Sequence, residues 1–174
     1  MVRDAQTTTA TLFLALWPGS ALRTALAVEQ ARWQWPGPAR PVDPDSMHLT
    51  LHYLGPVPLQ RLAELTSGLQ QPGRRFTLGL RRRECWRNGC AVLCPDTVPE
   101  ALHDLHGRLA RALQRLELPV DPRPWRPHVT LARRAAGAQP SQEPPTLTWA
   151  VRGWRLARSL GHGRYAELAR YACG

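Results

Sequence analysis

The sequence of residues 47–54 is MHLTLHYL, and that of residues 125–133 is WRPHVTLAR. Both stretches contain the tetrapeptide His-x-Thr-Leu, in which polar and apolar side chains alternate as in a strand with one buried face. Because neighbouring side chains of a strand point to opposite faces, the histidine and threonine of each tetrapeptide share one face. These residues are His48, Thr50, His128 and Thr130. We therefore expect two strands that each present an imidazole and a hydroxyl beside an apolar core face.

Each motif follows a predicted strand and a predicted helix. Before the first motif, an apolar run over residues 11–17 ends at a Pro-Gly pair, after which Ser20 is expected to cap an Ala- and Leu-rich helix. Before the second motif, an apolar run over residues 90–94 precedes a long amphipathic helix, which a capping box of Thr97 and Glu100 is expected to open. A proline-rich connection then leads from each helix to its motif.

The two strand-helix-strand units, at about residues 11–54 and 90–133, therefore indicate an internal duplication. A short tetrapeptide can easily occur twice by chance, but it is much less easily accidental that both copies follow the same order of strand, helix and proline-rich connection. Packing of the two units about a pseudo-twofold axis would bring both motifs into one cleft. The remaining periodicity predicts a helix near residues 59–69, strands within 75–83 and 146–160, and a last strand or short helix at 165–171.

Charge points to an anionic partner. The 174 residues include 23 arginines, no lysine and 13 acidic residues, which gives a net charge of +10. A G+C-rich coding bias accounts for arginine in place of lysine but not for the excess of positive charge. That excess favours a polyanion such as nucleic acid. A chain of this length can bury a core without disulfides, and no apolar run approaches the roughly 20 residues of a membrane span. We expect no membrane partner.

The cysteines and the extra histidines do not predict a metal site. No Cys-x-x-Cys pair occurs, so the cysteines are expected to be reduced thiols. His103 and His106 are three residues apart on a predicted helix, but the Glu and the four-residue spacing of the zincin pattern are absent. The apolar run 12–17 is shorter than a usual signal-peptide core, and Asp4 cancels the charge of Arg3. We expect no metal, no other cofactor and a cytoplasmic location.

Two imidazoles and two hydroxyls in one cleft suit hydrolysis of a phosphodiester. Water that attacks phosphorus must lose a proton, while the departing oxygen on the opposite side must gain one. With an ordinary pKa near 6.5, one neutral imidazole can act as base and one imidazolium as acid near neutral pH. The hydroxyls can donate hydrogen bonds to the non-bridging phosphate oxygens. A single histidine or threonine on a strand is more often a packing residue, so the hypothesis depends on the matched pair.

On these motifs the sequence resembles the two-histidine (2H) phosphoesterases, and within them the RNA 2′,3′-cyclic phosphodiesterases formerly called 2′-5′ RNA ligases. Residues 12–18, 47–55 and 126–133 carry the resemblance and occur in the family's order. It implies an α+β fold with two interleaved, pseudo-twofold-related lobes, antiparallel sheets flanked by helices, and a central cleft that carries both His-x-Thr-x motifs. It also implies one domain over residues 1–174.

The resemblance further implies hydrolysis of a terminal RNA 2′,3′-cyclic phosphate to a 2′-phosphomonoester, without a metal. His48 would be the proton donor to the leaving 3′ oxygen, and His128 would be the proton acceptor for the attacking water. Thr50 and Thr130 match the family's phosphate-binding threonines. Arg133 matches an arginine after the second motif that either binds phosphate or is a solvated surface charge.

Three more side chains are candidates for lining the substrate site. Tyr53 and Trp125 stand where the family often has Phe, so they either stack on a base or pack in the core. His52 shares the predicted face of the first motif and either lines the cleft or packs. Arg158 departs from the family, which has an acidic residue there. The arginines of residues 74–87 either follow an RNA backbone or form a solvated strand edge.

Two alternatives stay open beside cyclic phosphodiester hydrolysis. One is a phosphodiesterase or reversible ligase that acts on 2′-5′-linked oligonucleotides. The other is a noncatalytic RNA-binding protein with the same cleft, although binding alone needs no pair of proton-transfer groups. The expected partners are RNA ends or oligonucleotides that carry a 2′,3′-cyclic phosphate. A monomer is expected because both motifs can complete one cleft within one chain.

Overall fold

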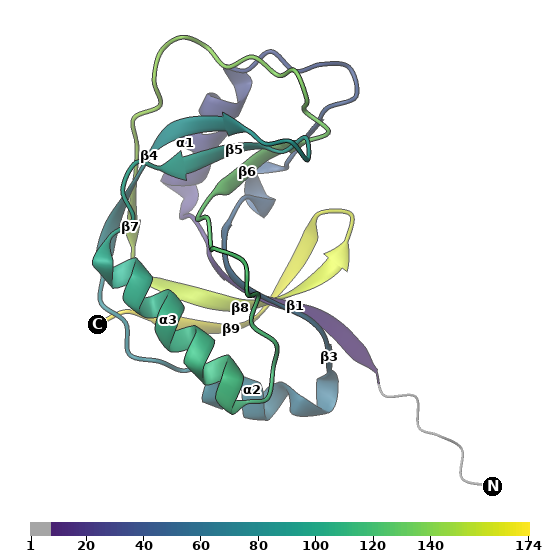
Figure 1. Cartoon of the computed structure of the whole chain (residues 1–174), viewed down its shortest axis with the longest axis vertical. Helices are drawn as coiled ribbons and strands as arrows, with labels where there is room; N and C mark the ends of the chain where they lie inside the picture. Colours follow the sequence, from purple (N-terminus) through teal and green to yellow (C-terminus); the bar gives the residue numbers. More distant parts are fainter. Residues whose placement is uncertain (1–7) are drawn as a thin grey trace, which may run out of the picture.

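Within residues 8–174, which the computed structural model describes, nine strands form one curved antiparallel sheet (Figure 1). Their order is β7-β4-β5-β6-β3-β1-β8-β9, and β2 lies beside β6. The strands are β1 Thr9–Leu16, β2 Arg40–Pro41, β3 Leu49–Pro58, β4 Phe76–Cys85, β5 Ala91–Pro95, β6 Val129–Arg133, β7 Leu147–Val151, β8 Gly153–Gly161 and β9 Arg164–Ala172. The helices are α1 Ser20–Ala31, α2 Leu62–Gly68 and α3 Glu100–Arg115, with short 3-10 turns η1 Pro44–Ser46 and η2 Leu59–Arg61.

The sheet consists of two similar halves that meet at the motif strands. One half is β3-β1-β8-β9 and the other is β6-β5-β4-β7. They are joined where β3 pairs with β6 through Leu49 and Val129. In each half the motif strand pairs antiparallel with the strand that opens its unit, β1 or β5. The predicted α+β architecture with two lobes is confirmed, although the lobes share one curved sheet instead of having two separate sheets.

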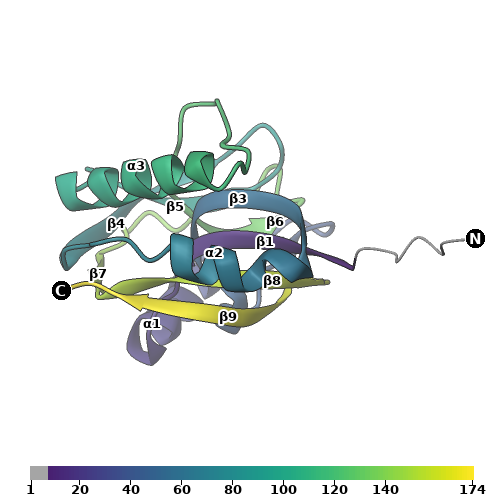
Figure 2. The same ribbon diagram turned by 90° about the horizontal axis from the view of Figure 1, so that it is seen from below.

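The helix of each unit covers the half of the sheet that holds the other motif. α1 packs against β7, and α3 packs against β3. Figure 2 shows the two helices on opposite sides of the sheet. The lobes are therefore interleaved through their helices as well as joined through their strands.

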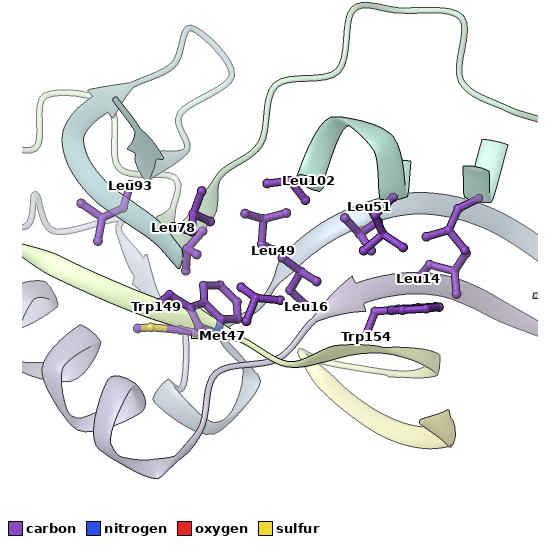
Figure 3. Packing of buried hydrophobic residues seen from close by; sticks show 14 of the residues in the cluster. Leu14, Leu16, Met47, Leu49, Leu51, Leu78, Leu93, Leu102, Trp149 and Trp154 are labelled. Atoms are coloured by element: carbon purple, nitrogen blue, oxygen red, sulfur yellow. The ribbon is translucent and has the colours of Figure 1, made fainter. Parts of the chain in front are cut away.

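A single stripe of apolar side chains fixes α3 on the sheet. Figure 3 shows Leu102 of α3 next to Leu49 of β3, in the same buried cluster as Leu51 of β3 and Leu14 and Leu16 of β1. Side chains that recur every three or four residues fall on one helix face. Burying each leucine contributes about 1.5–3 kcal/mol, so this stripe holds α3 behind the first motif. The buried members on α3 are Leu102, Leu105, Leu109, Ala112 and Leu113.

The predicted helix caps are wrong. α1 begins at Ser20 itself, with Gly19 in the N-cap position and no side-chain cap. α3 begins at Glu100, with Pro99 in the N-cap position and again no side-chain cap. The proline ring fixes φ, here −59°, and the N-cap position at Pro99 lies two residues after Thr97, so that α3 begins three residues after Thr97. The capping box of Thr97 and Glu100 therefore does not form.

Strand β3 is longer and less regular than predicted. The motif strand was expected to end at residue 54, but it continues to Pro58. Its register with β1 shifts so that Thr50 lies opposite Ala15 and His52 opposite Leu14, which leaves Leu51 as an extra residue. Such a bulge changes the face taken by the side chains that follow it. The last segment, for which strand and helix were both open, is the strand β9.

The first predicted strand and the cysteines can be compared with the part of the chain that the structure describes. The apolar run 12–17 lies mostly within β1, whereas Arg3 and Asp4, which entered the signal-peptide argument, lie outside the described residues. The four cysteines are free thiols. No helix within residues 8–174 is long and apolar enough to cross a membrane.

Candidate functional site

A cleft of about 450 Å³ opens where β3 and β6 meet. Its lining includes all four motif side chains, namely His48, Thr50, His128 and Thr130. Because Leu49 lies opposite Val129 in an antiparallel pair, the register continued by one residue in each direction sets each motif histidine across from the threonine of the other motif. The fold therefore brings the two motifs together in a symmetrical arrangement.

Each motif histidine is held by the backbone carbonyl two residues before it. Nδ1 of His48 lies 2.7 Å from the oxygen of Ser46, and Nδ1 of His128 lies 2.7 Å from the oxygen of Arg126. A carbonyl oxygen only accepts hydrogen bonds, so Nδ1 carries the hydrogen in both rings. Nε2 is then the nitrogen that can take up or release a proton.

Aromatic rings from β1, from the residue after β1 and from β9 surround His48. Trp17 stacks on the imidazole, with ring centroids 4.9 Å apart and planes inclined by 22°. Phe13 and Tyr165 contact it with centroid distances of 5.0 Å each. Together with small side chains of β1 and β8, these rings form an apolar cluster separate from the main core. The cluster restricts the imidazole to one orientation.

Burial lowers the pKa of both motif histidines. The pKa of His48 falls to about 4, and the positive charges of Arg133 and His128 add to the effect of burial. The pKa of His128 is also lowered, mainly by burial and further by the charges of Arg126 and Arg133. His48 is therefore neutral near neutral pH in the free protein. A bound anion would act in the opposite direction, since nearby negative charge favours the imidazolium.

The surroundings of His128 include residues that the sequence did not single out. Trp86 packs against the imidazole with a centroid distance of 4.4 Å, and the guanidinium of Arg126 lies 4.5 Å above the Trp86 ring. Glu84 accepts hydrogen bonds from both of these side chains. The sequence Glu-Cys-Trp at the end of β4 places Glu84 and Trp86 on the same side of the strand. This alternation was the sequence signal from which their pairing could have been predicted.

Two arginines add positive charge to the cleft. Arg40 and Arg133 both line it, and they lie opposite each other where β2 pairs with β6. Arg40 donates to the carbonyl of Ala39, and Nη1 of Arg133 lies 4.0 Å from Sγ of Cys90. In the part of the chain that the structure describes, neither guanidinium is paired with a carboxylate. This placement favours anion binding by Arg133 over the alternative of a solvated surface charge.

The hairpin of β8 and β9 closes one end of the cleft. His162, Gly163 and Tyr165 from this hairpin line it, and the hydroxyl of Ser46 donates to the carbonyl of Gly163 at 2.6 Å. Sequence reasoning assigned no role to His162. The hairpin is the yellow loop that projects beside β1 in Figure 1.

His52 lies outside the cleft, so its predicted position on the face of the first motif is wrong. The bulge at Leu51 turns the imidazole toward α3, where it is 5% exposed. Nε2 of His52 donates to the carbonyl of His106 at 2.9 Å, and the two rings stack with centroids 4.1 Å apart. Burial lowers the pKa of both histidines, that of His106 to about 4. His52 is thus a packing residue.

Tyr53 and Trp125 do not line the cleft either. The side chain of Tyr53 is 60% exposed, further along β3. Trp125 stacks on His106 with a centroid distance of 4.0 Å, and its Nε1 donates to the carbonyl of Thr50 at 3.1 Å. Trp125 therefore supports the backbone of the first motif from the side away from the cleft, which agrees with the packing alternative.

The basic stretch 74–87 is largely neutralised by nearby carboxylates. Four of its arginines form ion pairs, namely Arg74 with Asp104, Arg81 with Asp96, Arg82 with Glu84 and Arg83 with Glu29. The last pair is buried, with side chains 7% and 2% exposed. This arrangement favours a structural role over a track for an RNA backbone. Within residues 8–174 there is also no group of three or more His, Cys, Asp or Glu side chains arranged to hold a metal ion.

Comparison with known proteins gives consistent matches over most of the chain. A family model described as the 2'-5' RNA ligase superfamily matches residues 18–163. The RNA 2',3'-cyclic phosphodiesterase of Escherichia coli (strain K12) is 33% identical over 170 residues, which cover 92% of this chain and 95% of that protein. The protein of the same name from Thermus thermophilus is 31% identical over 164 residues, which cover 85% and 81%.

Solved structures give the same result. The crystal structure of E. coli LigT complexed with 3'-AMP is similar with a TM-score of 0.85 and 29% identity, covering 95% of this chain and 99% of that one. A crystal structure of a Thermus thermophilus protein is similar with a TM-score of 0.75 and 26% identity, covering 93% and 97%.

Proposed function

Since the chain belongs to the 2'-5' RNA ligase superfamily, we propose that it hydrolyses terminal RNA 2′,3′-cyclic phosphates to 2′-phosphomonoesters. The relatives from E. coli and T. thermophilus carry the name of this activity. The observation that carries the proposal is the meeting of two His-x-Thr motifs in one cleft, with each histidine across from the other threonine. Two fixed imidazoles on opposite sides of a phosphate provide the base and the acid that the reaction requires.

In this mechanism His128 is the proton acceptor and His48 the proton donor. Nε2 of His128 removes a proton from the attacking water while the water oxygen bonds to phosphorus. The bond between phosphorus and the 3′ oxygen breaks, and Nε2–H of His48 gives its proton to that oxygen. The product keeps the phosphate on the 2′ oxygen. Exchange of one proton with solvent at each ring restores the starting state, so one water is consumed per turnover.

Thr50, Thr130 and Arg133 are the proposed phosphate-binding residues. Both hydroxyls line the cleft and can donate to the non-bridging oxygens, whose charge changes in the transition state. The charge of Arg133 acts on both imidazoles and compensates the anion. The phosphate in turn raises the pKa of His48. The imidazole of His48 is therefore neutral in the free protein and becomes protonated when the substrate is bound. No step in this scheme calls for a metal or another cofactor.

The same groups support ligation as an alternative outcome. If the 5′ hydroxyl of a second RNA takes the place of water, loss of the 3′ oxygen leaves a 2′-5′ phosphodiester.

We further propose that residues 1–174 act as one domain and as a monomer, since one chain supplies all four motif side chains. An RNA substrate and four free thiols also support a cytoplasmic location.

The test is hydrolysis of an RNA oligonucleotide with a 2′,3′-cyclic phosphate end in the presence of EDTA, with product identification by mass spectrometry and ³¹P NMR. We expect a 2′-phosphate from the wild type and none from His48→Ala or His128→Ala. A mixture with an added 5′-hydroxyl RNA separates hydrolysis from ligation. Turnover that survives both substitutions, turnover lost only with EDTA, or binding without turnover would each overturn the proposal.

A further inference from the structure

Glu84 lies behind the wall of the cleft and bonds to two of the groups around His128. Its side chain is 24% exposed and does not belong to the cleft lining. Oε2 accepts from Nε1 of Trp86 at 2.8 Å and from Nη2 of Arg126 at 2.6 Å. Oε1 lies 3.3 Å from Nη1 of Arg82. The hydrogen bond from Trp86, with the charges of Arg126 and Arg82, lowers the pKa of Glu84, so the group is ionised at neutral pH.

Both partners of Glu84 also hold the imidazole of His128. The backbone carbonyl of Arg126 accepts the Nδ1 hydrogen at 2.7 Å. The ring of Trp86 packs against the imidazole, with centroids 4.4 Å apart and planes inclined by 59°, and the guanidinium of Arg126 lies 4.5 Å from the centroid of the Trp86 ring. One carboxylate therefore anchors the residue that fixes the imidazole tautomer and the residue that fixes its plane.

The matching half of the molecule lacks this connection. His48 also has a tryptophan with an arginine over it, since the guanidinium of Arg155 lies 5.6 Å from Trp17 and pairs with Glu167 at 2.9 Å. However, Nε1 of Trp17 donates to the backbone carbonyl of Asp45 instead of to a carboxylate. The carbonyl that holds His48 belongs to a serine. The two duplicated sites thus differ in whether a carboxylate is bonded to the support of the histidine.

We propose that Glu84 is a positioning residue for His128, which orients the imidazole and offsets the positive charge that it gains when it accepts a proton from water. The inference rests on the proposed function and adds a reason for the division of roles between the two histidines. Charged groups that face His128 are Arg126 and Arg133, which disfavour the imidazolium, and Glu84, which favours it. Among the described residues, no carboxylate raises the pKa of His48 in a corresponding way. This asymmetry makes His128 the better acceptor and protonated His48 the stronger acid.

The test measures the pKa of His128 and of His48 by NMR titration of their ring protons in the wild type and in Glu84→Gln. The amide keeps the size of the side chain and an oxygen that can accept from Trp86. We expect the pKa of His128 to fall and that of His48 to stay the same. We expect kcat to fall by about tenfold with little change in KM, the lower end of the roughly 10–100-fold cost of removing a group that orients a metal-ligating imidazole.

Two variants serve as controls. Glu167→Gln removes the carboxylate of the matching half and should leave the pKa of His128 unchanged. Glu84→Asp keeps the charge, so its His128 pKa and its kcat should be closer to those of the wild type than in Glu84→Gln. This comparison can still be made with the wild type if the glutamine variant folds poorly. An unchanged pKa of His128 in folded Glu84→Gln, or an aspartate variant no better than the glutamine variant, would overturn the inference. The titration needs no substrate, so absence of cyclic phosphodiester turnover in the wild type would refute the proposed function alone.

Discussion

Binding of an anion in the cleft should be accompanied by uptake of about one proton at His48. In the free protein the pKa of His48 is about 4 because the ring is largely shielded from water and faces the positive charges of Arg133 and His128. One pKa unit corresponds to about 1.36 kcal/mol, so protonating this imidazole at pH 7 costs about 4 kcal/mol. Negative charge beside the imidazole lowers the free energy of protonation and so raises the pKa of His48 in the complex.

The direction of the pH dependence follows from this linkage. The pKa of His48 is higher in the complex than in the free protein, so affinity is greatest at low pH and is lost as pH rises through the pKa of the complex. Between the free pKa of about 4 and the pKa of the complex, the Kd should rise about tenfold for each pH unit. Above the pKa of the complex, the Kd should become independent of pH.

The assay is isothermal titration calorimetry with inorganic sulfate, whose charge stays constant between about pH 5 and pH 8, so the ligand contributes no proton of its own. Titrations at about pH 6 in two buffers with different ionisation enthalpies give the number of protons taken up per sulfate. His48→Gln should remove the part of the uptake that belongs to this ring and leave only the share of His128, whose pKa is also lowered in the free protein. The matched control is His103→Gln, which changes a histidine of α3 that lies outside the cleft.

The reasoning is refuted if the wild type binds sulfate with the same Kd at about pH 5.5 and pH 7.5 and takes up no proton. Uptake that persists unchanged in His48→Gln would refute the assignment to this ring.

Three further outcomes test the structural supports. Trp125→Phe keeps an aromatic ring but removes the indole N–H that donates to the backbone carbonyl of Thr50, so urea unfolding should show a loss of about 1 kcal/mol from the hydrogen bond. The free energy of unfolding should fall as pH drops from about 6.5 toward 4, because the unfolded chain gains protons that the partly buried histidines of lowered pKa resist; His106→Phe removes one of these groups and should reduce that slope in urea titrations. Arg83→Met leaves buried Glu29 unpaired and should cost about 3–5 kcal/mol by thermal unfolding, whereas an unchanged Tm would contradict this role.

The sequence predicted those features that depend on neighbouring residues. Alternation around His48 and His128 identified two strands with a polar face, and the repeated strand-helix-strand order indicated that the motifs meet. The first is an alternation of polar and apolar residues and the second is a repeated order of elements, and both patterns can be recognised in a single sequence. The cleft lining by the four motif side chains follows from them.

Features that depend on distant contacts could not be predicted in this way. His52 was assigned to the wrong face because the bulge at Leu51 arises from the register with β1 and leaves no mark in the alternation. The bonds of Glu84 join the end of β4 to the segment before β6, 42 residues further along the chain. The ion pairs of the basic stretch likewise depend on which carboxylates the sheet brings near.

The exchange of helices between the halves has a consequence for how such a molecule can arise. α1 covers the half that contains the second motif, and α3 covers the half that contains the first. A chain with only one unit would leave the apolar face of its helix against water and its own strands uncovered. It would need a second copy to close both faces, with the two helices swapped between copies. Fusion of two such copies joins a symmetrical pair permanently, after which each half can diverge without losing its partner.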